Sequence, residues 1–350
     1  MSGDWRIPLV LLAVCVLAAA VAYGAPHVLS DYFVRIILLI ALNSILVLSL
    51  SLSNGFTGVF SLGHVGFIGA GAYVSGILSI PVQQKMALLP HLPSFLHWFS
   101  LPFLPATVVA GLFTAILAVI VGYPLMRLSG YFVSVATMGF LIIVNVVLIN
   151  ASDFTRGART FTGVPLETTL PWVFAWLGVT LFVLARLVYS PFGRSMKAVR
   201  DDTIAASAVG IGVLRARLIA FVIGAFFSGV GGSLYAHYLG SFSPNTFYFA
   251  MMINLIAMLV LGGMESLTGA LVGVVCVSIL SELLRSVERG FTFAGITVPA
   301  LFGASQIVLG FVFILIMIFR PKGIMGDREL TFGLAARSAR ARKRREEQNA

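Results

Sequence analysis

The sequence predicts an all-α, polytopic membrane protein of about ten transmembrane helices, with both termini in the cytoplasm. Of its 350 residues, 59% are hydrophobic and only 10% are charged, whereas an average soluble domain carries about 25% charged residues. So few charges cannot cover the surface of a water-soluble fold of this size. The apolar runs continue over about 20 residues, the length of a bilayer-spanning helix, while strands of a membrane barrel alternate over about ten residues.

Ten apolar segments are expected to form the transmembrane helices. They cover residues 7–24, 32–53, 57–80, 103–127, 131–150, 170–190, 216–239, 248–264, 267–285 and 300–320. The first segment has the length of a signal-peptide core, but Met1–Arg6 ahead of it carries no net positive charge, and apolar segments recur downstream. We therefore expect 7–24 to be a retained first helix.

The positions of Lys and Arg predict the orientation, because cytoplasmic loops are enriched in these residues. With the N-terminus inside, seventeen of the 23 Lys and Arg residues fall on the cytoplasmic side. We expect one membrane domain, 1–330, followed by a basic cytoplasmic tail, 331–350, that faces anionic membrane lipid. The net charge of +10 is concentrated in this tail and the loops, so nucleic acid is not an expected partner.

The longest cytoplasmic loop before the tail, residues 190–211, has the pattern of one or two amphipathic helices. One helical face is expected to collect four apolar residues: Met196, Val199, Ala206 and Val209. Asp202 is suited to cap the start of a short second helix, and Gly210 is suited to end it. The residues alone leave two roles open for this segment, a helix resting on lipid or a helix docking on a partner protein.

Three motifs resemble the ABC importer permeases of the LivM type. The loop is similar to that family's cytoplasmic coupling segment at Gly193, Arg194, Arg200, Asp201, Asp202, Ile204, Ala205, Ala206, Gly210 and Ile211. A third-helix signature is matched by Ser61-Leu62-Gly63-His64, followed by Phe67, Gly69, Gly71, Ala72 and Tyr73. The third motif is Gly130-Tyr131-Phe132 with the later Thr162-Gly163. Thr203 and Ser207 depart from the family, which commonly has glutamate at those places.

The resemblance implies a membrane-spanning subunit of an ATP-driven importer for branched-chain or other small amino acids, in the bacterial inner membrane. The implied partners are a second, different permease subunit, two ABC ATPase subunits and a periplasmic substrate-binding protein. The sequence has no Gly-x-x-x-x-Gly-Lys-Ser/Thr loop, so ATP hydrolysis is expected in partners and this chain is not expected to be an enzyme. Segment 193–211 is expected to couple the ATPases to transport through Gly193, Arg194, Arg200, Asp201, Asp202, Ala205, Ala206 and Gly210.

The glycine-rich third helix is the candidate substrate path. If the helix unwinds there, its free N–H and C=O groups could hold the carboxylate and ammonium of an amino acid. The candidate residues are Gly58, Ser61, His64, Gly66, Gly69, Tyr73 and Asn145. The small residues could instead simply let helices pack closely. A hydrogen-bonded packing role is favoured for His64, and no metal or cofactor is expected, because no second His or carboxylate lies at ligand spacing.

Other ligands and other functional classes make different demands on the sequence. Permeases with similar sequence motifs carry urea, short amides or small aromatic acids, so these remain alternative ligands. An ATP-independent secondary transporter would need an ion or proton site, yet Glu265 lies in a turn near the cytoplasmic face and Glu282 near the outer end of its helix. A membrane-embedded enzyme would need His, Asp or Glu residues that converge at depth.

Overall fold

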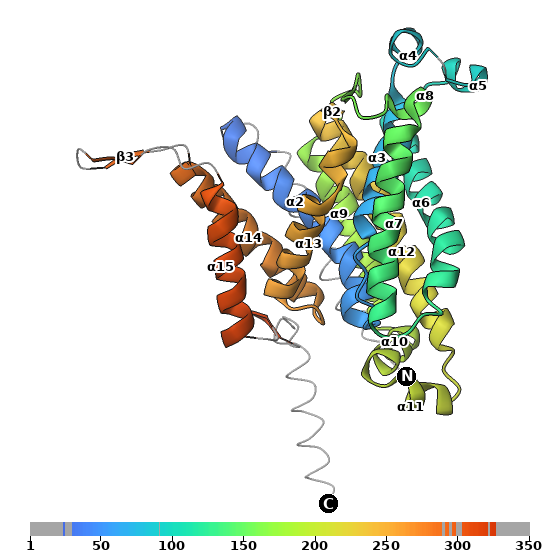
Figure 1. Cartoon of the computed structure of the whole chain (residues 1–350), viewed down its shortest axis with the longest axis vertical. Helices are drawn as coiled ribbons and strands as arrows, with labels where there is room; N and C mark the ends of the chain where they lie inside the picture. Colours follow the sequence, from blue (N-terminus) through green and yellow to red (C-terminus); the bar gives the residue numbers. More distant parts are fainter. Residues whose placement is uncertain are drawn as a thin grey trace, which may run out of the picture.

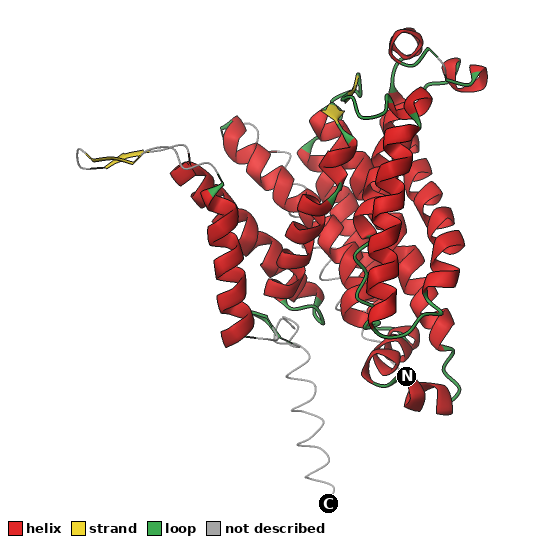
Figure 2. Cartoon of the chain, viewed as in Figure 1, coloured by secondary structure: helices red, strands yellow, loops and turns green. Residues whose placement is uncertain are grey.

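The computed structural model describes Gly24 and residues 30–90, 92–288, 291–293, 296–298, 303–320 and 323–326. The described chain is mostly helical, as expected (Figure 2). The long helices are α2 (Asp31–Ser51), α3 (His64–Ser79), α6 (Phe103–Leu125), α7 (Tyr131–Asn150), α9 (Leu170–Val188), α12 (Val213–Leu239), α13 (Phe249–Gly262), α14 (Leu267–Glu288) and α15 (Ala304–Phe319).

Short elements connect them. The short helices are the π-helix η1 (Leu52–Phe56), α4 (Val82–Leu88), α5 (Ser94–His97), α8 (Ser152–Thr155), α10 (Pro191–Asp201), α11 (Thr203–Ala208) and the 3-10 helix η2 (Pro244–Phe247). Two small antiparallel ribbons pair β1 (Phe161–Thr162) with β2 (Ser241–Phe242), and β3 (Phe291–Phe293) with β4 (Ile296–Val298). In the first ribbon, Phe161 lies opposite Phe242.

Helix α12 forms the centre of the bundle, where it packs against α2, α3 and α6 (Figure 1). Its apolar stretch is 67% buried, against 33% for those of α6 and α7. Glycines let α3 and α12 cross closely: a Cβ atom on Gly71 would lie 2.5 Å from the carbonyl oxygen of Gly229, and one on Gly232 would collide with that of Ile68. Small residues at crossings are the usual device of membrane helix packing.

The expected number of about ten spans is not confirmed. Within the described residues, seven helices are long and apolar enough to cross a bilayer, or eight if the bent pair α3 and α4 counts as one span. Helices α3 and α15 have 16 residues each and fall short of that length. The chain bends by 119° between α3 and α4. The expected helix 7–24 lies outside the described residues except for Gly24.

The predicted helix over 57–80 is wrong in its first part. The chain leaves η1 at Phe56, runs without regular structure through 57–63, and begins α3 at His64. Asn54 stabilises this irregular segment, because its side-chain oxygen accepts from the Ser61 N–H at 3.0 Å and its amide nitrogen donates to the Ser61 carbonyl at 3.3 Å. An Asn side chain can thus replace helical hydrogen bonds with local ones.

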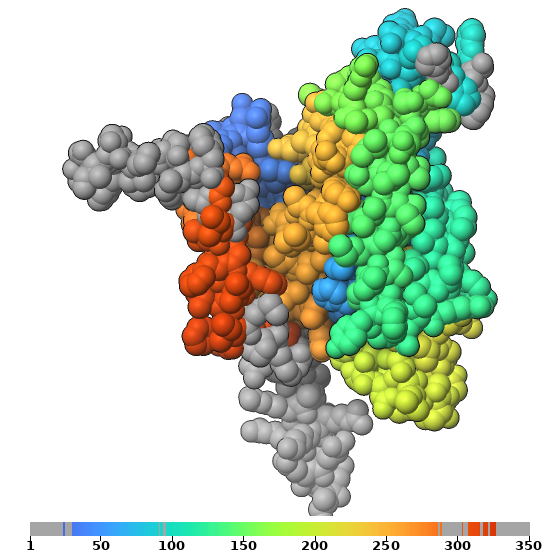
Figure 3. Space-filling model, in the orientation of Figure 1, coloured from blue at the N-terminus to red at the C-terminus, as the bar shows by residue number. Residues whose placement is uncertain are grey.

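The connecting elements lie at two opposite ends of the bundle. Helices α10 and α11 and the turn between α13 and α14 lie at one end, whereas α4, α5, α8 and β2 lie at the other (Figure 1). In the space-filling view, the yellow-green surface of α10 and α11 extends beyond α6 and α7 (Figure 3). Loops that the Lys and Arg pattern assigns to opposite sides of the membrane are therefore at opposite ends.

The chain after α15 returns to the end of α13. The N–H of Ile324 donates to the Leu261 carbonyl at 2.8 Å, and the N–H of Met325 donates to the Gly262 carbonyl at 3.1 Å. The last carbonyls of a helix have no partner within the helix. Residues 323–326 therefore cap α13 beside its turn to α14.

Two truncations should distinguish the role of this cap from that of the basic tail, which lies outside the described residues. Deleting 336–350 should leave assembly unchanged, whereas deleting 323–350 should lower stability, because each lost hydrogen bond is worth about 0.5–1.5 kcal/mol. The amount of protein in membranes and its Tm in detergent would measure this. Loss of the assembled complex on deletion of 336–350 alone would show that the tail binds a partner.

Candidate functional site

The element formed by α10 and α11 begins with a tight turn after α9. The Oγ atom of Ser190 accepts a hydrogen bond from the Gly193 N–H at 3.2 Å, and Pro191 occupies the first helical position. Proline suits that position because its missing N–H would have no partner there. Gly193 is buried, and a Cβ atom on it would collide with the carbonyl oxygen of Val188. The turn therefore requires glycine.

The expected cap and end of the second helix are confirmed. The Oδ1 atom of Asp202 accepts from the N–H groups of Ile204 at 2.8 Å and Ala205 at 3.0 Å, which caps the start of α11. After α11, Gly210 has a φ of +82°, a conformation that favours glycine. The local sequence thus specifies two short helices rather than one.

One side of this element packs on α12, and the other is exposed. Val199 and Ala206 are buried together with Ala216 of α12. The expected place of Val209 on the same face is wrong, because Val209 is 76% exposed. Ile204 on α11 is similarly exposed, at 79%. The helical period cannot continue from α10 into α11, because Asp202 between them is extended.

The coupling candidates differ in their surroundings. Exposed candidates are Arg194, Asp201, Asp202, Ala205 and Gly210, whereas Gly193 and Ala206 are buried and Arg200 is half-buried. Two neighbouring alanines thus have different environments. Ala205 lies on the free face of α11, while Ala206 belongs to its contact with α12.

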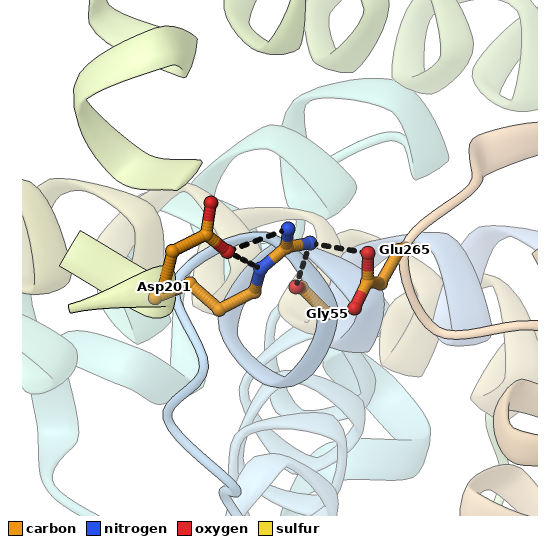
Figure 4. A network of polar contacts seen from close by, with 4 residues as sticks. Gly55, Asp201 and Glu265 are labelled. Atoms are coloured by element: carbon orange, nitrogen blue, oxygen red, sulfur yellow. Dashed lines mark hydrogen bonds and ion pairs between the residues drawn. The ribbon is translucent and has the colours of Figure 1, made fainter. Parts of the chain in front are cut away.

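Arg200 connects three elements through its guanidinium group (Figure 4). Its Nη2 pairs with Oδ1 of neighbouring Asp201 at 2.8 Å. Its Nη1 pairs with Oε2 of Glu265 in the turn between α13 and α14 at 2.8 Å and lies 3.4 Å from the Gly55 carbonyl oxygen of η1. Sequence reasoning missed the role of Glu265, although its place in a turn on the same side as the loop was a usable signal.

A small pocket lies between α2, α3 and α13. Its free volume is about 10 Å³, about the room of a single water molecule. Its lining side chains are largely aliphatic, with a polar edge at Ser61 and His64; the aliphatic residues include Leu46, Leu50, Val65, Ile68, Met252, Leu255 and Ile256. The pocket thus lies between the start of α3 and the side of α13 that faces it.

His64 is the polar group at depth beside this pocket. It is 2% exposed, and its Nδ1 lies 3.0 Å from the Oγ of Ser61. Its Nε2 has no hydrogen-bond partner among the described residues. A Cβ atom on Gly224 of α12 would lie 3.0 Å from this Nε2, so His64 occupies space that a larger residue on α12 would fill. The imidazole can offer one hydrogen bond in otherwise apolar surroundings.

The other path candidates do not gather at the pocket. Gly66 faces Phe140 of α7, Gly69 faces Phe247 of η2, and Gly58 lies exposed beside Arg200. Tyr73 packs against the rings of Phe161 and Phe242 in the β1–β2 ribbon. Asn145 donates to the Pro244 carbonyl of η2, just after that ribbon, at 3.1 Å. Of the seven candidates, Ser61 and His64 line the pocket.

Of the two roles left open for the glycines of the third helix, the structure favours close packing over unwinding at Gly66, Gly69 and Gly71. Helix α3 is continuous through Gly66, Gly69 and Gly71. These glycines lie where α3 contacts α7, η2 and α12. The irregular backbone lies before His64, and part of it is already paired: the Leu62 N–H donates to Oγ1 of Thr137 at 3.0 Å.

Sequence reasoning also missed a buried polar cluster toward the opposite end. Nε2 of His237 lies 3.1 Å from Oγ of Ser75, which lies 2.6 Å from Oγ of Ser233, and Nδ1 of His237 lies 2.9 Å from the Pro165 carbonyl oxygen. Ser233 and His237 lie four residues apart on α12, a spacing that puts them on one helix face. The cluster joins α3 and α12. No group of three or more His, Cys, Asp or Glu residues suited to a metal ion occurs in the part of the chain that the structure describes.

Comparison with known proteins gives a consistent picture. A family model described as the permease component of the branched-chain amino acid transport system matches residues 32–317. The high-affinity branched-chain amino acid transport system permease protein LivM of Escherichia coli (strain K12) is 29% identical, over 90% of this chain and 74% of the relative. The corresponding LivH protein of the same strain is 31% identical over 45% of each chain. No solved structure matches.

Proposed function

The chain belongs to the family of branched-chain amino acid transport permease components, and on that premise we propose that it forms half of the translocation path of an ATP-driven importer. It is a multi-pass membrane permease, and its relatives are transport permeases rather than enzymes. We place it in the bacterial inner membrane with a second, different permease, two ABC ATPases and a periplasmic substrate-binding protein. The proposed cargo is a branched-chain or other small amino acid.

One observation carries the proposed link to ATPases, namely the two-sided character of α10 and α11. One side is held on α12 by Val199 and Ala206, while Ile204 and Val209 present aliphatic surface to the outside. Such surface on a short capped helix suits a partner's groove better than it suits water. The element also lies on the side where Lys and Arg residues concentrate, which is the cytoplasmic side.

We propose that the substrate path passes the pocket beside Ser61 and His64. The pocket holds about 10 Å³, far too little for an amino acid, so the path is closed here and must open by movement of its walls. Residues Met252 and Leu255 on α13 form one wall and Leu46 on α2 forms another. Separation of α13 from α2 and α3 would widen the pocket.

Replacing His64 with glutamine should lower the import rate without abolishing it. A glutamine amide can keep one hydrogen bond to Ser61 but fills less of the space beside Gly224. We expect a decrease of less than about tenfold, which corresponds to about 1.4 kcal/mol in a rate. Initial import rates of the wild type and His64→Gln in vesicles would measure it. Complete loss of import with normal assembly would instead assign His64 an essential part in the path.

The ligand class is tested by competition in vesicles that contain the complete importer and its binding protein. Uptake of labelled leucine should be saturable and inhibited by isoleucine and valine. The alternative cargoes are urea, short amides and small aromatic acids, so urea, acetamide and benzoate should each leave leucine uptake unchanged. Saturable ATP-dependent uptake of one of these three, without leucine uptake, would reject the amino acid assignment.

A further inference from the structure

Two elements that lead to the pocket meet at the end of α10. The η1 helix precedes the irregular segment that contains Ser61, and the turn with Glu265 follows α13. Arg200 contacts both, through the Gly55 carbonyl oxygen at 3.4 Å and through the Glu265 carboxylate at 2.8 Å (Figure 4). A single cation on α10 thus connects both sides of the path.

The elements around Arg200 are closely packed. A Cβ atom on Gly55 would collide with the Met264 carbonyl oxygen, and one on Gly58 would lie 2.8 Å from Cγ of Arg200. The backbone of η1 therefore lies directly against the turn after α13. Lys197, one helical turn before Arg200, adds a second contact from α10, with its Nζ 5.6 Å from the centre of the Phe56 ring.

Hydrogen bonds continue from η1 to the pocket. Asn54 precedes Gly55 and holds both backbone polar groups of Ser61. Ser61 in turn lies 3.0 Å from His64 through its hydroxyl, and both residues line the pocket. On the other side, Glu265 lies three residues after the end of α13. Met252 and Leu255 of α13 line the opposite wall of the pocket.

We propose that Arg200 and Glu265 are the positioning pair that transmits movement of α10 to both walls of the pocket. This inference rests on the proposed function, in which ATPase partners move α10. Because the ion pair spans the gap between α10 and the α13–α14 turn, displacement of α10 pulls α13 through Glu265 and moves η1 through Gly55. Without the pair, ATP hydrolysis continues, but displacement of α10 no longer separates the two walls.

The test compares Arg200→Gln and Glu265→Gln in vesicles that contain the complete importer. Each variant should assemble with its ATPases and hydrolyse ATP, while import per ATP hydrolysed falls by about tenfold, a typical size for coupling between sites. The double variant should lose no more than either single one, because residues acting through one contact are not additive. Arg200→Lys, which keeps the charge, should retain more import than Arg200→Gln.

Arg285→Gln is the matched control, because it removes the 3.4 Å ion pair of Arg285 with Glu282, at the end of α14 that is far from Glu265. It should leave import per ATP unchanged. A wild-type ratio in Arg200→Gln and Glu265→Gln overturns the inference, as does loss of assembly in both, which would make the contact structural. If the wild type imports without ATP, the proposed function itself fails, so the two failures are distinguishable.

Discussion

Replacing Gly69 with valine should abolish import while the protein still assembles. A Cβ atom at Gly69 would already lie 3.1 Å from Cβ of Phe247, with Leu148 at 3.6 Å, and the two valine methyl groups extend beyond it. Overpacking of this kind costs about 1–3 kcal/mol, and about 1.4 kcal/mol corresponds to tenfold in a rate. Because Phe247 lies just ahead of α13, the clash would push α13 away from α3, so we expect the cost to fall on the return to the closed arrangement that each import cycle requires.

Gly66→Val should behave in the same way, since its Cβ atom would lie 3.2 Å from the Phe140 ring. Gly139→Val on α7 is the control, because nothing lies within 4 Å of a Cβ atom there. Gly71→Val should instead prevent folding, because its Cβ atom would meet the backbone of Gly229 at 2.5 Å. The measurements are the amount of assembled complex and the initial import rate. Full import by assembled Gly69→Val would contradict the proposed movement of α13 against α3.

Replacing Ala205 with aspartate should prevent docking of the ATPase and thereby stop ATP-driven import. Ala205 lies on the exposed face of α11, where a new charge cannot disturb the core but would be desolvated against a docked partner. Removal of a charge from water without a partner costs several kcal/mol, so we expect the ATPase to be lost on co-purification and import to fall at least about tenfold.

Two further variants at this site separate docking from folding. Ala205→Ser adds a polar atom without a charge and should retain both ATPase and import. Ala206→Asp places a carboxylate in the buried contact with α12, in the same cluster as Val199 and Ala216, so it should lower the Tm of the permease alone. Wild-type co-purification and import by Ala205→Asp would remove α11 from the docking surface.

The long helices could be predicted because their apolar runs carry the signal locally. The expected helix 131–150 matches α7, and the expected helix 267–285 matches α14, which continues to Glu288. The start of α3 could not be predicted in this way. Residues 57–63 are as small and apolar as a membrane helix, and the helix is replaced there by the bonds between Asn54 and Ser61, a contact that no helical period reveals.

The site was predicted in part for a similar reason. The Asp202 cap and the Gly210 turn depend on neighbouring residues and can be inferred from the loop sequence. The pairing of Arg200 with Glu265 depends on how α10 packs beneath the turn after α13, which a single sequence does not contain. The separation of exposed Ala205 from buried Ala206 likewise requires the position of α12.

The central claim is that this permease moves its cargo only when ATPase partners act on α10 and α11. The most direct measurement is leucine uptake into vesicles that contain the permease pair and the binding protein, with and without the ATPases, ATP and an imposed ion gradient. We expect uptake only with both the ATPases and ATP, and no dependence on the gradient. Leucine uptake driven by an ion gradient in vesicles that lack the ATPases would contradict the account and identify a secondary transporter.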